Sequence, residues 1–342
     1  MHVITTTADL AAACDRLAAH PFVTVDTEFL RESTYWPVLC LIQLASAEEA
    51  LIVDPLADGI DLAPFYELMS AASSTKVFHA ARQDVEIVHH QAGIIPAPLF
   101  DTQVAAMVCG FGDSISYVNL VRTVANIGLD KGARFTDWSR RPLSEKQLSY
   151  ALADVTHLRD VYLYLVARLE ETGRAGWLAE EMAVLTNPDT YLTKPEDAWR
   201  RLKLKVKDRR ALAILMELAA WREAQAQSQN VPRNRVLKDD ALYDIANQAP
   251  TTAEKLGRLR SIHDGFQRSQ RGKDIIRVVE SGLERDLTDV PQPRSGRSMT
   301  AAEQATFDLL KVLLKACAAE HQVAAKMLAD TDDLERIATG VT

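Results

Sequence analysis

The sequence predicts an α/β domain followed by a region built only from helices. Over residues 1–190, short runs of β-branched and aromatic residues alternate with amphipathic stretches, as in α/β or α+β domains. No convincing strand follows Asn187, and residues 205–285 have the pattern of several short amphipathic helices with polar connectors. A chain of 342 residues is also long enough for two or three domains at roughly 100–200 residues each.

The elements expected in the first domain follow from two periodicities. A strand is predicted where a short apolar or β-branched run is bounded by polar residues, and a helix where apolar residues recur three and four apart. The predicted strands are His2–Ile4, Phe22–Thr27, Val38–Ala45, Glu49–Val53 and Lys76–His79. The predicted helices are Ala8–Ala19, Leu62–Ala72, Ala81–Gln91, Asp101–Cys109, Tyr117–Asn126, Ser144–Arg168 and Gly176–Leu185.

The rest of the chain is predicted to be helical. The helices expected there are Asp208–Gln227, Lys238–Asn247, Gly272–Leu283, Ala301–Glu320 and Val323–Leu328. Two prolines and a glycine in residues 290–298 interrupt regular structure, which indicates a linker. The expected organisation is therefore a domain at 1–190, a helical domain at 205–285, a linker at 286–298 and a further helical segment at 299–342.

Composition excludes several classes of protein. Hydrophobic residues make up 47% and charged residues 25% of the chain, which argues against a disordered or collagen-like protein. The longest nearly unbroken apolar run, Val38–Ala45, is far shorter than the ~20 residues that span a bilayer, and the N-terminus has no signal-peptide pattern. The four cysteines lie far apart without a CxxC pair, unlike a disulfide framework or a zinc site. We therefore expect a cytoplasmic protein that does not associate with membranes.

The charge is distributed unevenly along the chain. A net charge of -8 argues at first sight against a nucleic-acid partner, because phosphate binding depends on lysine and arginine. Residues 1–190, however, carry a net charge of -12, whereas residues 191–297 carry +7. An acidic domain beside a basic segment is compatible with a site that binds cations next to one that binds phosphates.

The most informative segment is the predicted strand that ends in two acids, Asp26 and Glu28. Residues two apart in a strand point to the same face, so these carboxylates are expected to project side by side. Adjacent carboxylates repel each other unless a cation is present, and hard oxygen ligands suit Mg²⁺ or Mn²⁺. Taken alone, the pair is more typical of solvated acids at the end of a strand than of a metal site.

Two further segments carry candidate site residues. Asp84 falls in the first turns of the helix after the strand at 76–79, where the helix dipole favours a carboxylate whatever its role. Tyr150 and Asp154 are four residues apart in a strongly helical stretch and share one face, as a plain surface pair would also do. Histidines near these segments, such as His79, are expected to be packed or solvated rather than catalytic.

The three segments together resemble the ribonuclease D family, which belongs to the DEDD exonuclease superfamily and has a tyrosine in its third motif. Asp26-Thr27-Glu28-Phe29 is similar to the first motif of that family. Residues 78–84 and 150–154 are similar to the second and third motifs, in the same order along the chain. Lys131 and the run 136–144 resemble this family more closely than other members of the superfamily.

The resemblance extends beyond the catalytic motifs. Residues 205–285 resemble the HRDC helical domain that RecQ-type helicases and ribonuclease D share, and residues 299–342 resemble the opening helices of a second one. The resemblance implies a ribonuclease H-like mixed sheet with flanking helices, followed by all-α HRDC-type domains. It also implies a metal-dependent 3′→5′ exoribonuclease that releases 5′-mononucleotides.

Specific roles for the motif residues follow from the resemblance. Two divalent ions, Mg²⁺ or Mn²⁺, would be bridged by Asp26; Glu28 and Asp154 would complete one ion site, and Asp84 would support the other through water. Tyr150 would position the attacking water, because a phenol with a pKa of ~10 is a poor general base near neutral pH.

Basic residues outside the motifs are candidates for RNA contacts. The candidates are Lys131, Arg140, Arg141, Arg200, Arg201, Lys203, Lys205 and Lys207, and each could instead be solvated or paired with an acid. Trp138 could stack on a base, although core packing is the more ordinary role for a tryptophan.

The resemblance implies tRNA precursors with 3′ extensions as substrates, and no obligate protein partner is expected. A non-catalytic RNA-binding adaptor is disfavoured because all five motif residues are present. A DNA 3′→5′ exonuclease of the same superfamily is disfavoured by the helical C-terminal region.

Overall fold

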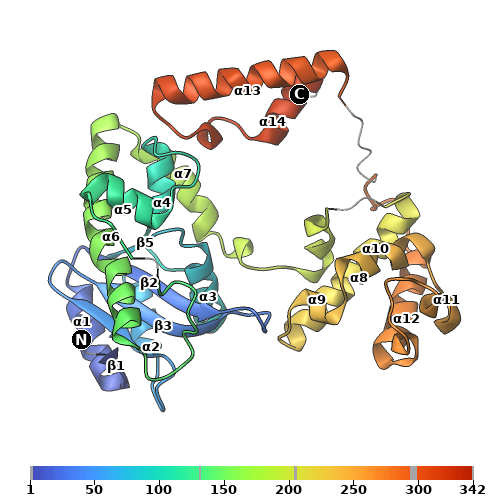
Figure 1. Cartoon of the computed structure of the whole chain (residues 1–342), viewed down its shortest axis with the longest axis horizontal. Coiled ribbons are helices and arrows are strands. Elements are labelled where there is room, and N and C mark those ends of the chain that lie inside the picture. The colour runs from blue at the N-terminus through green and yellow to red at the C-terminus, as the bar shows by residue number, and fades with distance from the viewer. Residues whose placement is uncertain (1–2, 131, 204–205, 293–298, 341–342) are drawn as a thin grey trace. The chain divides into compact units, whose positions relative to one another are not determined.

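The computed structural model describes residues 3–130, 132–203, 206–292 and 299–340 (Figure 1). Contacts between Cα atoms divide the chain into two compact units. The first unit comprises the described residues of Met1–Leu30, Val38–Tyr191 and Ser298–Thr342, and the second those of Arg31–Pro37 and Leu192–Arg297. Among the described residues, no helix is both long and apolar enough to cross a membrane.

A mixed six-stranded sheet organises the first unit. Its strands are β1 (Val3–Ile4), β2 (Phe22–Leu30), β3 (Val38–Ala45), β4 (Ala50–Val53), β5 (Thr75–Phe78) and β6 (Leu99–Asp101). The spatial order is β1-β4-β3-β2-β5-β6. The strand β2 runs antiparallel to β3 and parallel to β5, so Asp26 and Glu28, which β2 carries, lie in the middle of the sheet. This arrangement confirms the mixed sheet that the family resemblance implies.

Helices cover both faces of this sheet. They are α1 (Thr7–Ala18), α2 (Ala63–Ser70), α3 (Arg82–Ala92), α4 (Thr102–Val108), α5 (Tyr117–Ala125), α6 (Glu145–Thr172) and α7 (Ala175–Thr186), with a 3₁₀ turn at Pro188–Thr190. Successive side chains of β2 point to opposite faces of the sheet. On one face, Val23 and Val25 pack in a core cluster with residues of α1, α2 and α3. Thr24 on the opposite face donates a hydrogen bond to the Val155 carbonyl of α6, at 2.8 Å.

The long helix α6 contacts β2, β3 and β4 and carries the third motif (Figure 1). Ser144 caps its N-terminus in a capping box with Gln147, which satisfies two backbone groups that the first turn leaves unpaired. Gly173 ends it in the left-handed conformation (φ 66°), which glycine adopts without steric cost. The capping signal explains why the predicted start of this helix at Ser144 agrees with the structure, whereas the predicted end at Arg168 lies four residues before the observed end at Thr172.

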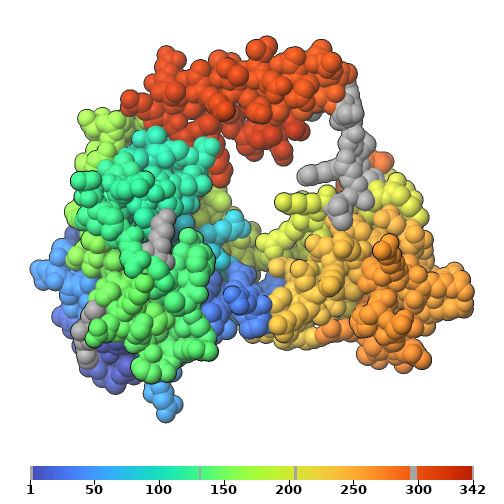
Figure 2. Space-filling model, in the orientation of Figure 1, coloured from blue at the N-terminus to red at the C-terminus, as the bar shows by residue number. Residues whose placement is uncertain are grey.

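The second unit is helical and has its own core, and it fills a closely packed body coloured yellow to orange in Figure 2. Its elements are a 3₁₀ segment at Pro195–Arg201, α8 (Arg209–Ser228), α9 (Arg233–Val236), α10 (Asp239–Gln248), α11 (Ala253–Gly257), a 3₁₀ turn at Phe266–Arg268, and α12 (Gln270–Glu284). Helices α8 and α12 approach so closely at Gly282 that a Cβ there would lie 2.7 Å from Ile214 Cα. The connector Arg31–Pro37 belongs to this unit, where Tyr35 packs with Ala226 and Val236.

The C-terminal helices pack with the first unit. They are α13 (Ala301–His321), a 3₁₀ turn at Ala325–Met327, and α14 (Thr331–Thr339). The Ala324 amide donates to the Met107 carbonyl at 2.9 Å, and Arg174 donates to the Gln322 carbonyl at 3.0 Å. Residues 299–340 are therefore attached to the rest of the sheet-containing unit by a backbone hydrogen bond and by hydrogen bonds from an arginine side chain, among others.

The structure corrects one predicted helix and adds one short strand and several short helices that the sequence analysis did not predict. The sequence analysis missed β6, because three residues at a sheet edge are too few to show alternation. The helix predicted at 323–328 is only a 3₁₀ turn, whereas α14 was not predicted. The short helices α9 and α11, of four and five residues, were also missed. Part of the predicted linker, 293–298, lies outside the described residues.

Candidate active site

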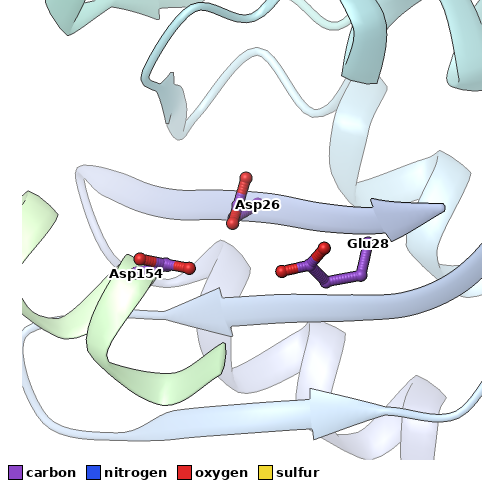
Figure 3. A group of neighbouring side chains, drawn as sticks. All are labelled: Asp26, Glu28 and Asp154. Atoms are coloured by element: carbon purple, nitrogen blue, oxygen red, sulfur yellow. The ribbon is translucent and has the colours of Figure 1, made fainter. Parts of the chain in front are cut away.

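Three carboxylates converge between β2 and α6. Asp26 and Glu28 project from the same face of β2, and Asp154 faces them from α6 (Figure 3). One oxygen from each of the three side chains can be chosen so that all lie within 4.8 Å of one another. The hydrogen bond from Thr24 to the carbonyl next to Asp154 fixes α6 against β2 at this point. Strand alternation therefore predicted the Asp26–Glu28 pair correctly, and the tertiary fold adds Asp154.

Asp84 reaches the site region from the other face of the sheet. It lies in the first turn of α3 and is buried, and its carboxylate accepts a hydrogen bond from Thr27 Oγ1 at 2.5 Å. Thr27 lies between Asp26 and Glu28 in the sequence and so points away from α6. Asp84 is therefore a neighbour of the three converging carboxylates rather than a member of their group.

Tyr150 lies one helical turn before Asp154 on α6. Its hydroxyl hydrogen-bonds to the Asp154 carboxylate, and its ring lies 6.0 Å from that of Trp138. Burial, followed by the charge of Asp154, raises the pKa of Tyr150. The phenol is therefore a neutral hydrogen-bond donor at neutral pH, which agrees with a positioning role.

The carboxylates are destabilised as anions in the absence of a cation. Burial, reinforced by Asp154 and Asp84, raises the pKa of Glu28 to about 8. Burial also raises the pKa of Asp26 well above its usual range, and the pKa values of Asp84 and Asp154 to about 7. The guanidinium of Arg134 opposes the shift at Glu28 and Asp154. A bound cation would reduce the electrostatic repulsion between these buried carboxylates. Carboxylate oxygens are ligands that hard divalent cations prefer.

Both the sequence and the fold of this chain are similar to those of known proteins. Residues 1–170 match the family model of a 3′-5′ exonuclease, and residues 211–279 match that of the HRDC domain. The chain is 59% identical over 338 residues to ribonuclease D of Nitrobacter hamburgensis, covering 99% of this chain and 88% of that protein. The chain belongs to the ribonuclease D family.

Other relatives agree with this assignment. Ribonuclease D of Jannaschia sp. is 51% identical over 345 residues, covering 100% of this chain and 89% of that protein. The crystal structure of Escherichia coli RNase D superposes with a TM-score of 0.85 at 31% identity, over 99% of this chain and 90% of that one. As a member of the ribonuclease D family, the chain is a 3′→5′ exoribonuclease that acts on RNA, and this family depends on divalent metal ions. The family, fold class and activity predicted from the motifs are thereby confirmed.

A cavity of about 340 Å³ opens beside the carboxylates of this ribonuclease D family member. Asp26, Tyr150 and Asp154 line it, and so do Arg134 and Tyr117. The Tyr117 hydroxyl donates to the Ala153 carbonyl at 2.9 Å, which holds α6 next to Asp154. The sequence analysis overlooked Tyr117, because a tyrosine at the start of an amphipathic helix carries no signal of such a contact.

Asp101 is a second residue that the sequence analysis assigned no function. It is buried and caps α4, accepting a hydrogen bond from the Gln103 amide at 2.7 Å. The same carboxylate accepts from the amides of Ala80 (3.0 Å) and Ala81 (2.8 Å), where Ala80 has a φ of 61° that side chains rarely adopt. Asp101 therefore fixes the strained turn from which α3, with Asp84, begins. The cap itself could have been predicted from an aspartate before a helix, whereas the two longer-range hydrogen bonds could not.

The basic residues fall into distinct groups. Arg140, Arg200, Arg201, Lys203 and Lys207 are exposed, although Arg200 pairs with Asp197 at 2.9 Å and Lys207 Nζ donates to the Asn247 carbonyl at 2.6 Å. Lys131 and Lys205 lie outside the described residues. Arg141 differs from the rest: Nε and Nη2 each donate to the Asp54 carboxylate at 2.6 Å, and the other donors go to backbone carbonyls. Trp138 is buried in the core.

Proposed function

We propose that this site shortens RNA from its 3′ end, with Asp26, Glu28, Asp84 and Asp154 as the metal-binding carboxylates and Tyr150 as the positioning group. The observation that carries the proposal is the convergence of Asp26, Glu28 and Asp154 within 4.8 Å, with their pKa values raised by burial. The donor set fits the cofactor, because the converging groups are all carboxylates and such oxygens suit Mg²⁺ or Mn²⁺. When bound, two such ions supply acidification of water and charge neutralisation at phosphorus.

Each motif residue has its own proposed role in binding the ions or in orienting the attacking water. Asp26, which lies within reach of both Glu28 and Asp154, would contribute to both ion sites. Glu28 and Asp154 would complete the first ion site. Asp84, which accepts from Thr27 and lies outside the group of three, is suited to act through water. The protonated phenol of Tyr150 would orient the attacking water beside Asp154.

We also propose a division of the chain by role. Residues 1–190 would form the catalytic domain, 205–285 the first HRDC domain, 286–298 a linker and 299–342 part of a second HRDC-like domain. Arg140, Arg200, Arg201, Lys203 and Lys207 would hold the RNA strand by phosphate contacts. Lys131 and Lys205 stay predictions from the sequence. Arg141 is left out, because all five of its N–H donors are used within the protein.

The proposed substrates are tRNA precursors with 3′ extensions, degraded to 5′-mononucleotides. Support comes from the Escherichia coli relative, which is described as an exoribonuclease involved in structured RNA processing. A cytoplasmic location is proposed because all four cysteines are free thiols, as in a reducing compartment. No obligate protein partner is proposed.

The test is to incubate the chain with 5′-labelled RNA whose 3′ end is free or blocked, with Mg²⁺, Mn²⁺ or EDTA. We expect stepwise shortening of the free RNA with metal, and none with EDTA or in Asp26→Ala and Asp154→Ala. Shortening that persists with EDTA or in both variants would refute the metal site. Equal shortening of the blocked RNA would refute the 3′→5′ direction, and a matched DNA strand degraded faster than the RNA would refute the substrate class.

A further inference from the structure

The helical unit contains a cavity of about 410 Å³ that is lined by none of the catalytic residues described above. Four arginines line it, Arg31, Arg201, Arg222 and Arg233, and among the described residues of its wall Asp239 is the one carboxylate. Its volume falls within the roughly 300–1,000 Å³ typical of small-ligand sites. A concave wall with this excess of guanidinium groups points to an anionic ligand.

Arg222 is the most unusual of these residues because it is charged and buried, with a side chain only 6% exposed. Its Nη1 donates to Asp239 Oδ1 at 2.6 Å and to the Leu237 carbonyl at 3.0 Å. Its Nε is buried and has no hydrogen-bond partner among the described residues. Arg222 nevertheless lines the cavity, and the charge of an anion bound there would offset part of the free-energy cost of burying its guanidinium.

Arg233 is held rigidly in the cavity wall. Its Nε and Nη2 donate to the two oxygens of Glu223, at 2.5 and 2.6 Å, and its guanidinium lies 4.7 Å from the centre of the Tyr35 ring. The Tyr35 hydroxyl also hydrogen-bonds to Glu223, so the same network fixes the connector Arg31–Pro37. The wall is therefore preorganised, which lowers the entropic cost of binding.

Arg201 supplies the accessible charge. It is exposed, lines the cavity, and follows Arg200 and precedes Lys203, which are also exposed. Planar guanidinium groups bind phosphate oxygens in bidentate geometry, and a phosphate can accept from several donors at once. Asn234 and Thr34 add neutral polar groups to the same wall.

We propose that this cavity binds a phosphate group, supplied either by the RNA chain or by a free nucleotide. The inference rests on the proposed function, because that function brings RNA to this protein and releases mononucleotides from it. It goes beyond the exposed basic residues, because it assigns a built site around the buried Arg222. Binding at this site would hold a phosphate in a fixed position on the helical unit.

The test compares Arg201→Gln and Arg222→Lys with Arg260→Gln in the full chain. Arg260 is exposed in the same unit and does not line the cavity, so its replacement is a control for the loss of one positive charge. Binding of a fluorescent RNA is measured by anisotropy in EDTA, which prevents hydrolysis, at several salt concentrations. Binding of adenosine 5′-monophosphate is measured by calorimetry in the same buffer. Circular dichroism checks that each variant is folded, and Arg201→Gln, an exposed replacement, keeps the test valid if Arg222→Lys unfolds.

If the phosphate belongs to RNA, Arg201→Gln weakens RNA binding about five- to tenfold relative to Arg260→Gln and reduces the salt slope by ~0.7, the value for one phosphate contact on a single strand. If it belongs to a free nucleotide, the cavity variants lose nucleotide binding while RNA binding matches the control. Either result supports the phosphate site and identifies its source. Variants that bind both probes as Arg260→Gln does would overturn the inference, even if the wild-type chain shortens RNA. Conversely, a chain that binds phosphate here but fails to shorten RNA would overturn the proposed function alone.

Discussion

Arg140 and Arg141 are adjacent in the sequence and both were predicted to contact RNA, yet the structure gives them different surroundings. The Arg141 side chain is 27% exposed and its partner Asp54 is 11% exposed, and all five N–H donors of Arg141 have acceptors. The Arg140 side chain is 85% exposed and has one ion pair, with Asp137 at 3.4 Å. We therefore predict that Arg141→Gln destabilises the fold, whereas Arg140→Gln weakens RNA binding.

The magnitude for Arg141→Gln follows from these partners. Breaking a fully buried pair costs about 3–5 kcal/mol, and the partial exposure of Arg141 reduces the expected cost to about 2–3 kcal/mol. At roughly 2–3 kcal/mol per molar urea, the unfolding midpoint of the sheet-containing unit should fall by about 1 M. The exposed ion pair of Arg140 contributes at most about 1 kcal/mol to stability, so the unfolding midpoint of Arg140→Gln should barely differ from that of the wild type.

The assay is urea unfolding followed by circular dichroism, together with RNA anisotropy in EDTA at several salt concentrations. Arg140→Gln should reduce the salt slope of RNA binding by ~0.7, and Arg141→Gln should leave the slope of the folded protein unchanged. Each variant is the control for the other, because both remove one positive charge from the same loop. The reasoning is refuted if Arg141→Gln keeps the wild-type midpoint and loses RNA affinity as Arg140→Gln does.

Three further predictions concern Tyr150, Asp101 and Lys76. Tyr150→Phe should lower kcat on RNA by roughly 10–100-fold with RNA affinity unchanged, because it removes only the orienting hydroxyl; steady-state rates check this, and an unchanged kcat would contradict the role. Asp101→Ala leaves three backbone amides without their acceptor and should cost about 3 kcal/mol in urea unfolding, while Asp101→Asn, which keeps one oxygen, should cost less. Equal losses in the two variants would argue against the hydrogen bonds as the cause. The Lys76 ammonium is fully buried and donates to three carbonyls at 2.5–2.7 Å, so Lys76→Met should destabilise the fold by about 2–4 kcal/mol; a stability equal to wild type would show that these carbonyls need no donor.

The central part of the site could be predicted because strand alternation is a strict rule. Asp26 and Glu28 share a face wherever β2 is paired, and the register with β3 puts them opposite Gln43 and Leu41. The helical spacing of Tyr150 and Asp154 gave their shared face in the same way. What local rules could not supply was the packing of α6 on β2 through Thr24, which brings Asp154 to Asp26 from 128 positions further along the chain.

Contacts between distant segments also explain the residues that sequence reasoning missed. Asp101 holds the turn at Ala80 from the end of β6, a strand too short to have its own pattern. Its carboxylate could be predicted as a helix cap, but its second role depends on β5 and β6 being neighbours in the sheet.

The role of an arginine depends on how many of its five donors the fold already uses, which composition cannot reveal. Arg141 has none left for a ligand, and Arg233 donates to both carboxylate oxygens of Glu223. Arg222 is buried, and its Nε has no partner within the part of the chain that the structure describes. Arg140 and Arg201 are exposed on the protein surface. The number of lysines and arginines in residues 191–297 therefore overstates the side chains available to RNA, since Arg222 and Arg233 pair with Asp239 and Glu223 of the same segment. Phosphate affinity should accordingly depend on the arginines that line the cavity and on exposed side chains such as Arg201, rather than on the number of basic residues in the segment.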